Sequence, residues 1–172
     1  VLVAAIRNED LDFYKKLATE AGLQVEWVGL RPSANLQAVA ANSPDFATKN
    51  VLVVEVGPQL TEIDIVLKGR LAFSRSASVA LPDFDAGPVQ GVQDSRIISQ
   101  GVSDQQDNEV SQQAVNDLMV DIIRSFEAFR ATDPTVSVDH IVVCGACGVE
   151  PALTQSLAAR FAAKAEMFSP ER

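Results

Sequence analysis

The fold is decided by the stretch from Asn50 to Ser76, NVLVVEVGPQLTEIDIVLKGRLAFSRS. Its first part, 51–56, is a short apolar run rich in β-branched residues, and a glycine-proline pair interrupts it. Over 61–67 apolar and acidic residues largely alternate, which is typical of a strand with two different faces. A second turn follows at 68–70, where glycine can supply the positive φ that a short hairpin needs. The stretch therefore predicts a three-stranded meander.

The first turn of this meander is the candidate phosphate loop of the sequence. Glu55 and the backbone amides around Gly57 are expected to meet at the end of a buried strand, and Thr61 returns opposite them. Backbone N–H groups and a hydroxyl suit a phosphate, and a carboxylate suits a magnesium ion bound through water. The turn is therefore the first place to look for a bound nucleotide.

Composition bounds the class of protein. The chain has 172 residues, 47% of them hydrophobic, which suffices for one domain or for one domain and part of another. A net charge of −9 without any Lys/Arg cluster weighs against nucleic acid and against an anionic membrane surface as partners. No apolar run approaches the roughly 20 residues of a spanning helix, so direct membrane insertion is not expected. We expect a cytoplasmic protein, and we expect further sequence upstream because Val1 already lies inside an apolar run.

The N-terminal part, residues 1–42, predicts a small unit joined to the rest by a helix. A polar link containing Pro44 then indicates a domain boundary before Asn50. The expected elements are a strand over 1–6, a helix over 11–21 that ends at Gly22, a strand over 25–30 and a linking helix over 33–41.

The middle of the chain changes character twice. Residues 80–109 lack periodicity and are rich in Gly, Pro, Asp, Gln and Ser, which leaves a functional loop or a disordered one, with disorder favoured. Over 109–131 a wide apolar stripe predicts the longest helix of the chain, with its charged residues on a solvated face.

The last unit is DHIVVCGACGVEPALTQSLAARFAAKAEMFSP. It predicts a buried strand over 141–144, a turn of small residues over 145–148, and a helix over 151–165 with Pro151 near its start. A strand, a turn of small residues and a helix in this order often bind a phosphate or a nucleotide, because the backbone can approach a ligand closely at the turn and the helix N-terminus favours negative charge. Many α/β proteins, however, use small residues here only to let strand and helix pack.

Two cysteines in this unit allow other chemistry. Cys144 and Cys147 form C-G-A-C between a strand and a helix, where a thioredoxin-like dithiol would place its nucleophile. Too few residues follow for the rest of that fold. A zinc site or an imidazole-dependent triad is less favoured still, since His140 is the single histidine. The favoured interpretation is that both cysteines are small buried hydrophobic residues.

Four segments in the same order and spacing resemble one family. VLVAAI, a helix ending AGL, VEWVGL and ANLQAVA resemble the end of the inserted subdomain in PilM-type, actin-like type IV pilus assembly proteins, which are similar to the cell-division protein FtsA. VVEVGPQLTEIDIVLKGRLAFSR resembles their second phosphate motif and hairpin, DIIRSFEAFR a characteristic helix, and IVVCGACGVEPAL their adenosine motif. The resemblance covers most of the chain outside 80–109 and corresponds to the C-terminal portion of the family.

The resemblance implies a fold and a set of site residues. The fold is an α/β, actin-like ATPase (ribonuclease H-like) domain with a mixed sheet over 50–172, with a reduced loop at 80–109. Residues 1–42 become the end of the inserted subdomain and a linking helix. The phosphates of a nucleotide would lie at Glu55, Gly57 and Thr61, and the base at Gly145 and Ala146.

The chain departs from the family pattern at the residues that matter for chemistry. Glu55 stands where the family has aspartate, and Ala146 and Ala152 stand where it has glycine. The first phosphate motif would lie upstream of Val1. We therefore expect no catalytic residue, no metal site and no cofactor in this chain, with ATP and Mg left to a full-length protein.

The favoured function is a non-enzymatic scaffold in type IV pilus or related secretion-system assembly. By resemblance it would dock a membrane-anchored protein partner at the inner face of the membrane, and a homo-oligomer is left open. Two alternatives remain, an ATP-binding enzyme of the actin and sugar-kinase group and a C-x-x-C thiol redox module.

Overall fold

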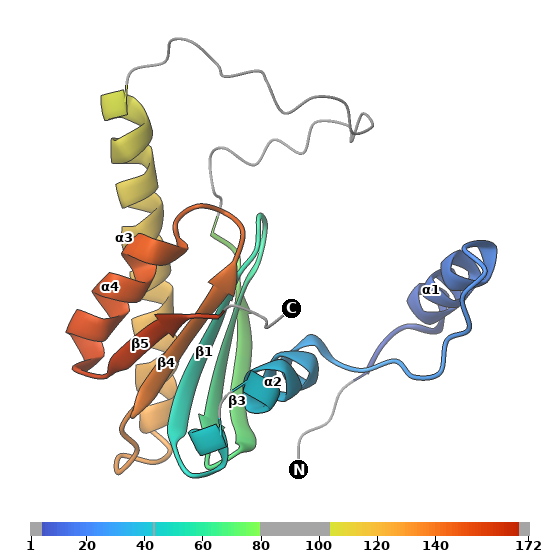
Figure 1. Cartoon of the computed structure of the whole chain (residues 1–172), viewed down its shortest axis with the longest axis horizontal. Coiled ribbons are helices and arrows are strands. Elements are labelled where there is room, and N and C mark those ends of the chain that lie inside the picture. Colours follow the sequence, from blue (N-terminus) through green and yellow to red (C-terminus); the bar gives the residue numbers. More distant parts are fainter. Residues whose placement is uncertain (1–4, 43, 80–103, 169–172) are drawn as a thin grey trace.

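A five-stranded mixed sheet forms the centre of the computed structural model, which describes residues 5–42, 44–79 and 104–168 (Figure 1). The strand order is β3-β2-β1-β4-β5. The strands are β1 (Asn50–Val56), β2 (Thr61–Leu67), β3 (Arg70–Ala77), β4 (His140–Gly145) and β5 (Lys164–Met167).

Strand pairing confirms the predicted meander and the mixed sheet. β1 pairs antiparallel with β2, and β2 pairs antiparallel with β3. β4 lies parallel to β1 on its other side, with Val143 opposite Val54. Residues 51–56 and 141–144 therefore share one sheet, as the resemblance required.

Helices cover both faces of the sheet. α3 (Asp104–Arg130) and α4 (Glu150–Phe161) lie on one face, and α2 (Arg31–Asn42) lies on the other, followed by the short 3-10 helix η1 (Pro44–Ala47) (Figure 1). Side chains alternate between the faces of a strand. In β1, Leu52 and Val54 accordingly join the core on the α3 and α4 side, while Val51 and Val53 join the core on the α2 side.

The two cores differ in size. Burying one Leu or Ile side chain stabilises a fold by about 1.5–3 kcal/mol, so the larger core supplies most of the stability. Its largest fully buried members are Leu52, Ile63, Ile65, Leu118, Ile122, Ile141, Leu153 and Leu157. The core beneath α2 contains Val39, Phe46, Val51, Val53, Val66 and Val142.

The strands predicted in the N-terminal part are not found among the described residues. Residues 1–4 lie outside them, 5–7 are not in a strand, and 25–30 are irregular and exposed, with Trp27 68% exposed. A strand needs a neighbour for its N–H and C=O groups, and none of the described strands lies beside this segment. The helix of this part does form, as α1 (Asn8–Glu20), with Gly22 at φ +71 just beyond it, and none of its residues is buried.

Two boundaries in the C-terminal half also differ from the prediction. α3 begins at Asp104, so the predicted loop over 80–109 extended too far, and 80–103 lie outside the described residues. α4 ends at Phe161 because Ala162 adopts a left-handed conformation with φ +50. The chain then turns back into β5, so the helix predicted over 151–165 was too long at its C-terminal end. In the described ranges, none of the helices has the length and apolarity that a bilayer crossing needs.

Candidate functional site

All five predicted site residues lie at one end of the sheet, where β1 and β4 stop side by side. Register places Glu55 opposite Cys144 and Val56 opposite Gly145. On the other side of β1, Val56 faces Thr61 across the hairpin. The turn that contains Gly57 and the turn that contains Gly145 and Ala146 are thus neighbours. Their role in binding a cofactor stays a prediction.

The first turn is tightly closed on itself. The Gly57 N–H donates to the Leu60 carbonyl at 3.2 Å, and a Cβ on Gly57 would lie 2.7 Å from that same oxygen. This close approach of the backbone is sufficient reason for a glycine at position 57.

The Thr61 side chain points into the protein and not toward the solvent at the turn. It shares its strand face with Ile63 and Ile65, which belong to the larger core, and it is 1% exposed. Its hydroxyl oxygen has no hydrogen-bond partner in the described part of the chain. The hydroxyl is therefore directed into the protein.

Glu55 faces α2 and is held by it. Its Oε2 accepts a hydrogen bond from Asn35 Nδ2 at 2.8 Å, and the side chain is half-buried. Asn35 lies on the linking helix α2. This hydrogen bond therefore orients the Glu55 carboxylate and connects α2 to the end of β1.

The second turn is filled by a side chain of its own helix. Glu150, at the start of α4, is 2% exposed, and its Oε1 accepts a hydrogen bond from the Cys147 N–H at 2.6 Å. A Cβ on Gly145, whose φ is +147, would lie 2.5 Å from Glu150 Oε1 and equally close to the Val56 carbonyl. Only glycine fits there, and the carboxylate occupies the space beneath the turn.

Two further carboxylates lie on the α2 face beside Glu55. Glu62 is 7% exposed and accepts hydrogen bonds from the Ser74 and Ser76 hydroxyls at 3.2 and 3.4 Å. Asp64 is 1% exposed, and neither of its oxygens has a well-formed hydrogen bond in the described residues. Burial raises the pKa of Asp64 to about 6, with nearby Ser74 lowering it in part and Glu62 raising it further.

The cysteines do not form a reactive pair. Both are free thiols, and both lie near β1 carbonyls, Cys144 Sγ at 3.6 Å from the Val54 oxygen and Cys147 Sγ at 3.6 Å from the Val56 oxygen. Burial and the charge of Glu55 raise the pKa of Cys144 to about 11, and burial also raises the pKa of Cys147. A nucleophilic cysteine needs the opposite shift.

Metal binding finds no support in the side chains that the structure describes. Within 5–42, 44–79 and 104–168, no three His, Cys, Asp or Glu side chains are grouped to hold an ion. His140 begins β4 while Cys144 is near its end, so the strand itself separates the two ligands that a zinc site would need.

Solved structures provide the wider comparison. The chain is similar to a chain of the PilM-PilN type IV pilus biogenesis complex, with a TM-score of 0.64 and 16% identity over 95% of this chain and 48% of that one. It is also similar to MreB5 of Spiroplasma citri bound to ADP, with a TM-score of 0.62 and 16% identity over 97% of this chain and 62% of that one. The AMPPNP-bound form of MreB5 gives a TM-score of 0.60 and 16% identity over 95% and 61%.

The chain has the actin-like ATPase fold. At this level of identity the likeness concerns the fold alone, and the chain spans about half the length of the pilus chain and about three fifths of MreB5. At the level of sequence, no family model and no curated protein matches it.

Within this actin-like sheet, sequence analysis missed Glu150 and Asp64. A signal existed for Glu150, because an acidic residue directly before Pro151 lies at the N-terminus of the helix predicted over 151–165, where a carboxylate is stabilised. Asp64 gave no such signal. Alternation along 61–67 placed it on the polar face of a strand, and only the position of α2 buries that face.

Proposed function

We propose that this chain is part of a non-enzymatic scaffold for type IV pilus or related secretion-system assembly, which docks a membrane-anchored protein partner from the cytoplasm. The motif resemblance and the likeness to a PilM-PilN biogenesis complex support the proposal from two sides. In that complex the pilus protein is paired with another protein, and here we assign the chain a partner of the same kind.

The observation that carries the non-enzymatic half of the proposal is the filled turn after β4. Glu150 places a buried carboxylate beneath Gly145, next to where the resemblance puts the base of a nucleotide. Thr61 directs its hydroxyl into the core, and Glu55 is already bonded to Asn35. As they lie, these side chains do not fit an adenine nucleotide with its magnesium ion, because the Glu150 side chain fills the space beneath the second turn and the Gly57 N–H of the first turn is already bonded to the Leu60 carbonyl.

An ATP-binding enzyme is the second candidate. It is favoured by the MreB5 structures, which hold ADP and AMPPNP, and by the two glycine turns that this chain keeps side by side at the end of its sheet. The thiol redox module is disfavoured by the raised pKa of both cysteines.

A crosslinking experiment in the source cells tests the proposal. The tagged full-length protein is crosslinked in living cells, purified from detergent-solubilised membranes, and its partners are identified by mass spectrometry. We expect a partner with a membrane-spanning helix, and we expect deletion of either gene to remove pili or the secretion function. Rapid turnover of ATP by the purified full-length protein, without such a partner, would favour the enzyme instead.

A further inference from the structure

We propose that a pocket at the opposite end of the sheet binds an acidic peptide segment of a protein partner, through Arg130 and Arg160. This inference is independent of the function proposed above, because it rests on other residues and on the far end of the domain. The pocket lies where α3 and α4 end, and it has a volume of about 230 Å³. Its lining residues are Phe126, Glu127, Arg130, Val136, Ser137, Val138, Arg160 and Phe161.

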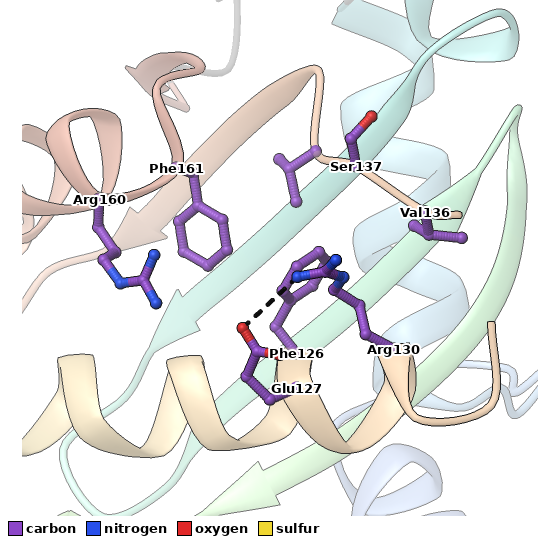
Figure 2. A pocket seen from close by; sticks show the side chains of 8 residues that line it. Phe126, Glu127, Arg130, Val136, Ser137, Arg160 and Phe161 are labelled. Carbon is purple, nitrogen blue, oxygen red and sulfur yellow. Dashed lines mark ion pairs between the residues drawn. The ribbon is translucent and has the colours of Figure 1, made fainter. Parts of the chain in front are cut away.

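The two arginines are arranged in the same way. Arg130 Cζ lies 5.9 Å from the centre of the Phe126 ring, and Arg160 Cζ lies 5.9 Å from the centre of the Phe161 ring. Figure 2 shows the two side chains approaching the pocket from different helices, with Glu127 between them. A ring beside a guanidinium group restrains it, while its N–H groups remain available for the paired hydrogen bonds that carboxylates accept.

Both arginines keep unused hydrogen-bonding capacity. Arg130 Nε is buried and has no partner in the described residues, and its one ion pair, to Glu127, is long at 3.8 Å. Arg160 makes no hydrogen bond or ion pair with any side chain that the structure describes. The Arg130 side chain is 42% exposed and Arg160 is exposed, so the outer N–H groups of both guanidinium groups can reach an acceptor from outside.

Charge and size select the ligand. The two arginines and Glu127 leave one net positive charge in the pocket, which suits a single carboxylate better than a phosphate dianion. Cofactor-sized ligands occupy cavities of about 300–1,000 Å³. This smaller pocket takes one or two side chains, and its Phe and Val walls suit an apolar residue beside the acid.

Fluorescence anisotropy with the whole chain tests the assignment. The probe is a labelled peptide in which one aspartate lies between a leucine and a phenylalanine, and its control carries asparagine in place of the aspartate. We expect saturable binding of the acidic peptide only, weakened about tenfold by Arg130→Gln and by Arg160→Gln. Glu127→Gln should tighten binding about threefold, because it removes the competing carboxylate.

Arg124→Gln is the matched control, since Arg124 lies on the same helix away from this pocket and lines a different one. It should leave binding unchanged. Nitrogen-15 NMR of the same titration should move the Arg130 Nε–H signal and leave that of Arg124 in place. Equal binding of the asparagine peptide, displacement by inorganic phosphate at lower concentration than the peptide, or insensitivity to both arginine variants would overturn the proposal. So would concentration-dependent dimerisation that Arg160→Gln abolishes, since a second copy would then be the occupant.

Discussion

The two faces of the sheet are filled in different ways. Toward α3 and α4 the buried part of the face is apolar apart from the Thr61 hydroxyl, and at the edge strand Arg75 donates to Ser125 of α3 at 3.2 Å. Toward α2 the face is apolar at one end only, and at the other it carries Glu55, Glu62 and Asp64. One face of this actin-like sheet therefore supplies most of the apolar core, while the polar half of the other face carries carboxylates whose burial lowers stability unless they are hydrogen-bonded.

The largest effect is expected on the α3 and α4 face. Leu153→Ala removes a side chain with no exposed surface and should lower the free energy of unfolding by about 2–5 kcal/mol. Leu36→Ala makes the same chemical change on α2, where the side chain is only partly buried, and should cost about 1 kcal/mol. Urea unfolding measures both. Equal losses would contradict the division of the sheet into a stabilising face and a second, looser one.

An intermediate effect on the free energy of unfolding is expected from replacing Asp64 in the acidic half of the α2 face, and this effect should depend on pH. Burial raises the pKa of Asp64 from 3.8 to about 6, so the folded chain binds this proton more tightly than the unfolded chain. The stabilisation is complete below the lower value and is lost as the pH rises through the higher one, on the order of 3 kcal/mol in all. Asp64→Asn should therefore be more stable than the parent at neutral pH, and the difference should vanish near the lower pKa.

Urea unfolding across that pH range checks this prediction. Asp12→Asn, on the exposed helix α1, is the control and should leave the pH dependence of stability unchanged. A parent and an Asp64→Asn variant with parallel pH profiles would mean that Asp64 is ionised as readily in the folded state as in the unfolded one.

The smallest effect concerns the buried hydroxyl on the apolar face. Thr61→Val replaces a hydroxyl that has no partner in the described residues by a methyl group of the same size, and should stabilise the fold by about 1 kcal/mol. Thr154→Val is the matched change, because the Thr154 hydroxyl donates to the Glu150 carbonyl at 2.7 Å, and it should bring no gain. Destabilisation by Thr61→Val would show that the hydroxyl is hydrogen-bonded within the folded chain after all.

Local pattern was enough to predict four of the five strands of this sheet, β1 to β4. Alternation along 61–67 and the apolar runs in β1 and β4 depend only on which residues face the core, and the glycine turns follow from backbone geometry. β5 was missed because AAKAEM continues a helical pattern, and only the left-handed Ala162 ends the helix. The strand predicted over 25–30 failed for the reverse reason, since its apolar pattern fits a strand but none of the described strands pairs with it.

The predicted site residues lie close together, and their role in binding stays a prediction. Glu55, Gly57, Thr61, Gly145 and Ala146 are neighbours, as the register of β1 with β2 and β4 makes plain. What sequence spacing does not give is the direction of the Thr61 hydroxyl, the bond from Asn35 to Glu55, or the position of the Glu150 carboxylate beneath Gly145. These depend on how two helices pack on the sheet, which is a property of tertiary structure.

Side chains of the protein itself fill the end of the sheet where β1 and β4 stop, and calorimetric titration of the purified chain with Mg-ATP is the sharpest test of this statement. We expect no saturable heat of binding in the parent, because the Glu150 side chain fills the space beneath the second turn and the Gly57 N–H is bonded within the first. Saturable binding with one nucleotide per chain, lost on Gly57→Val, would contradict it and place a working nucleotide site at the ends of β1 and β4.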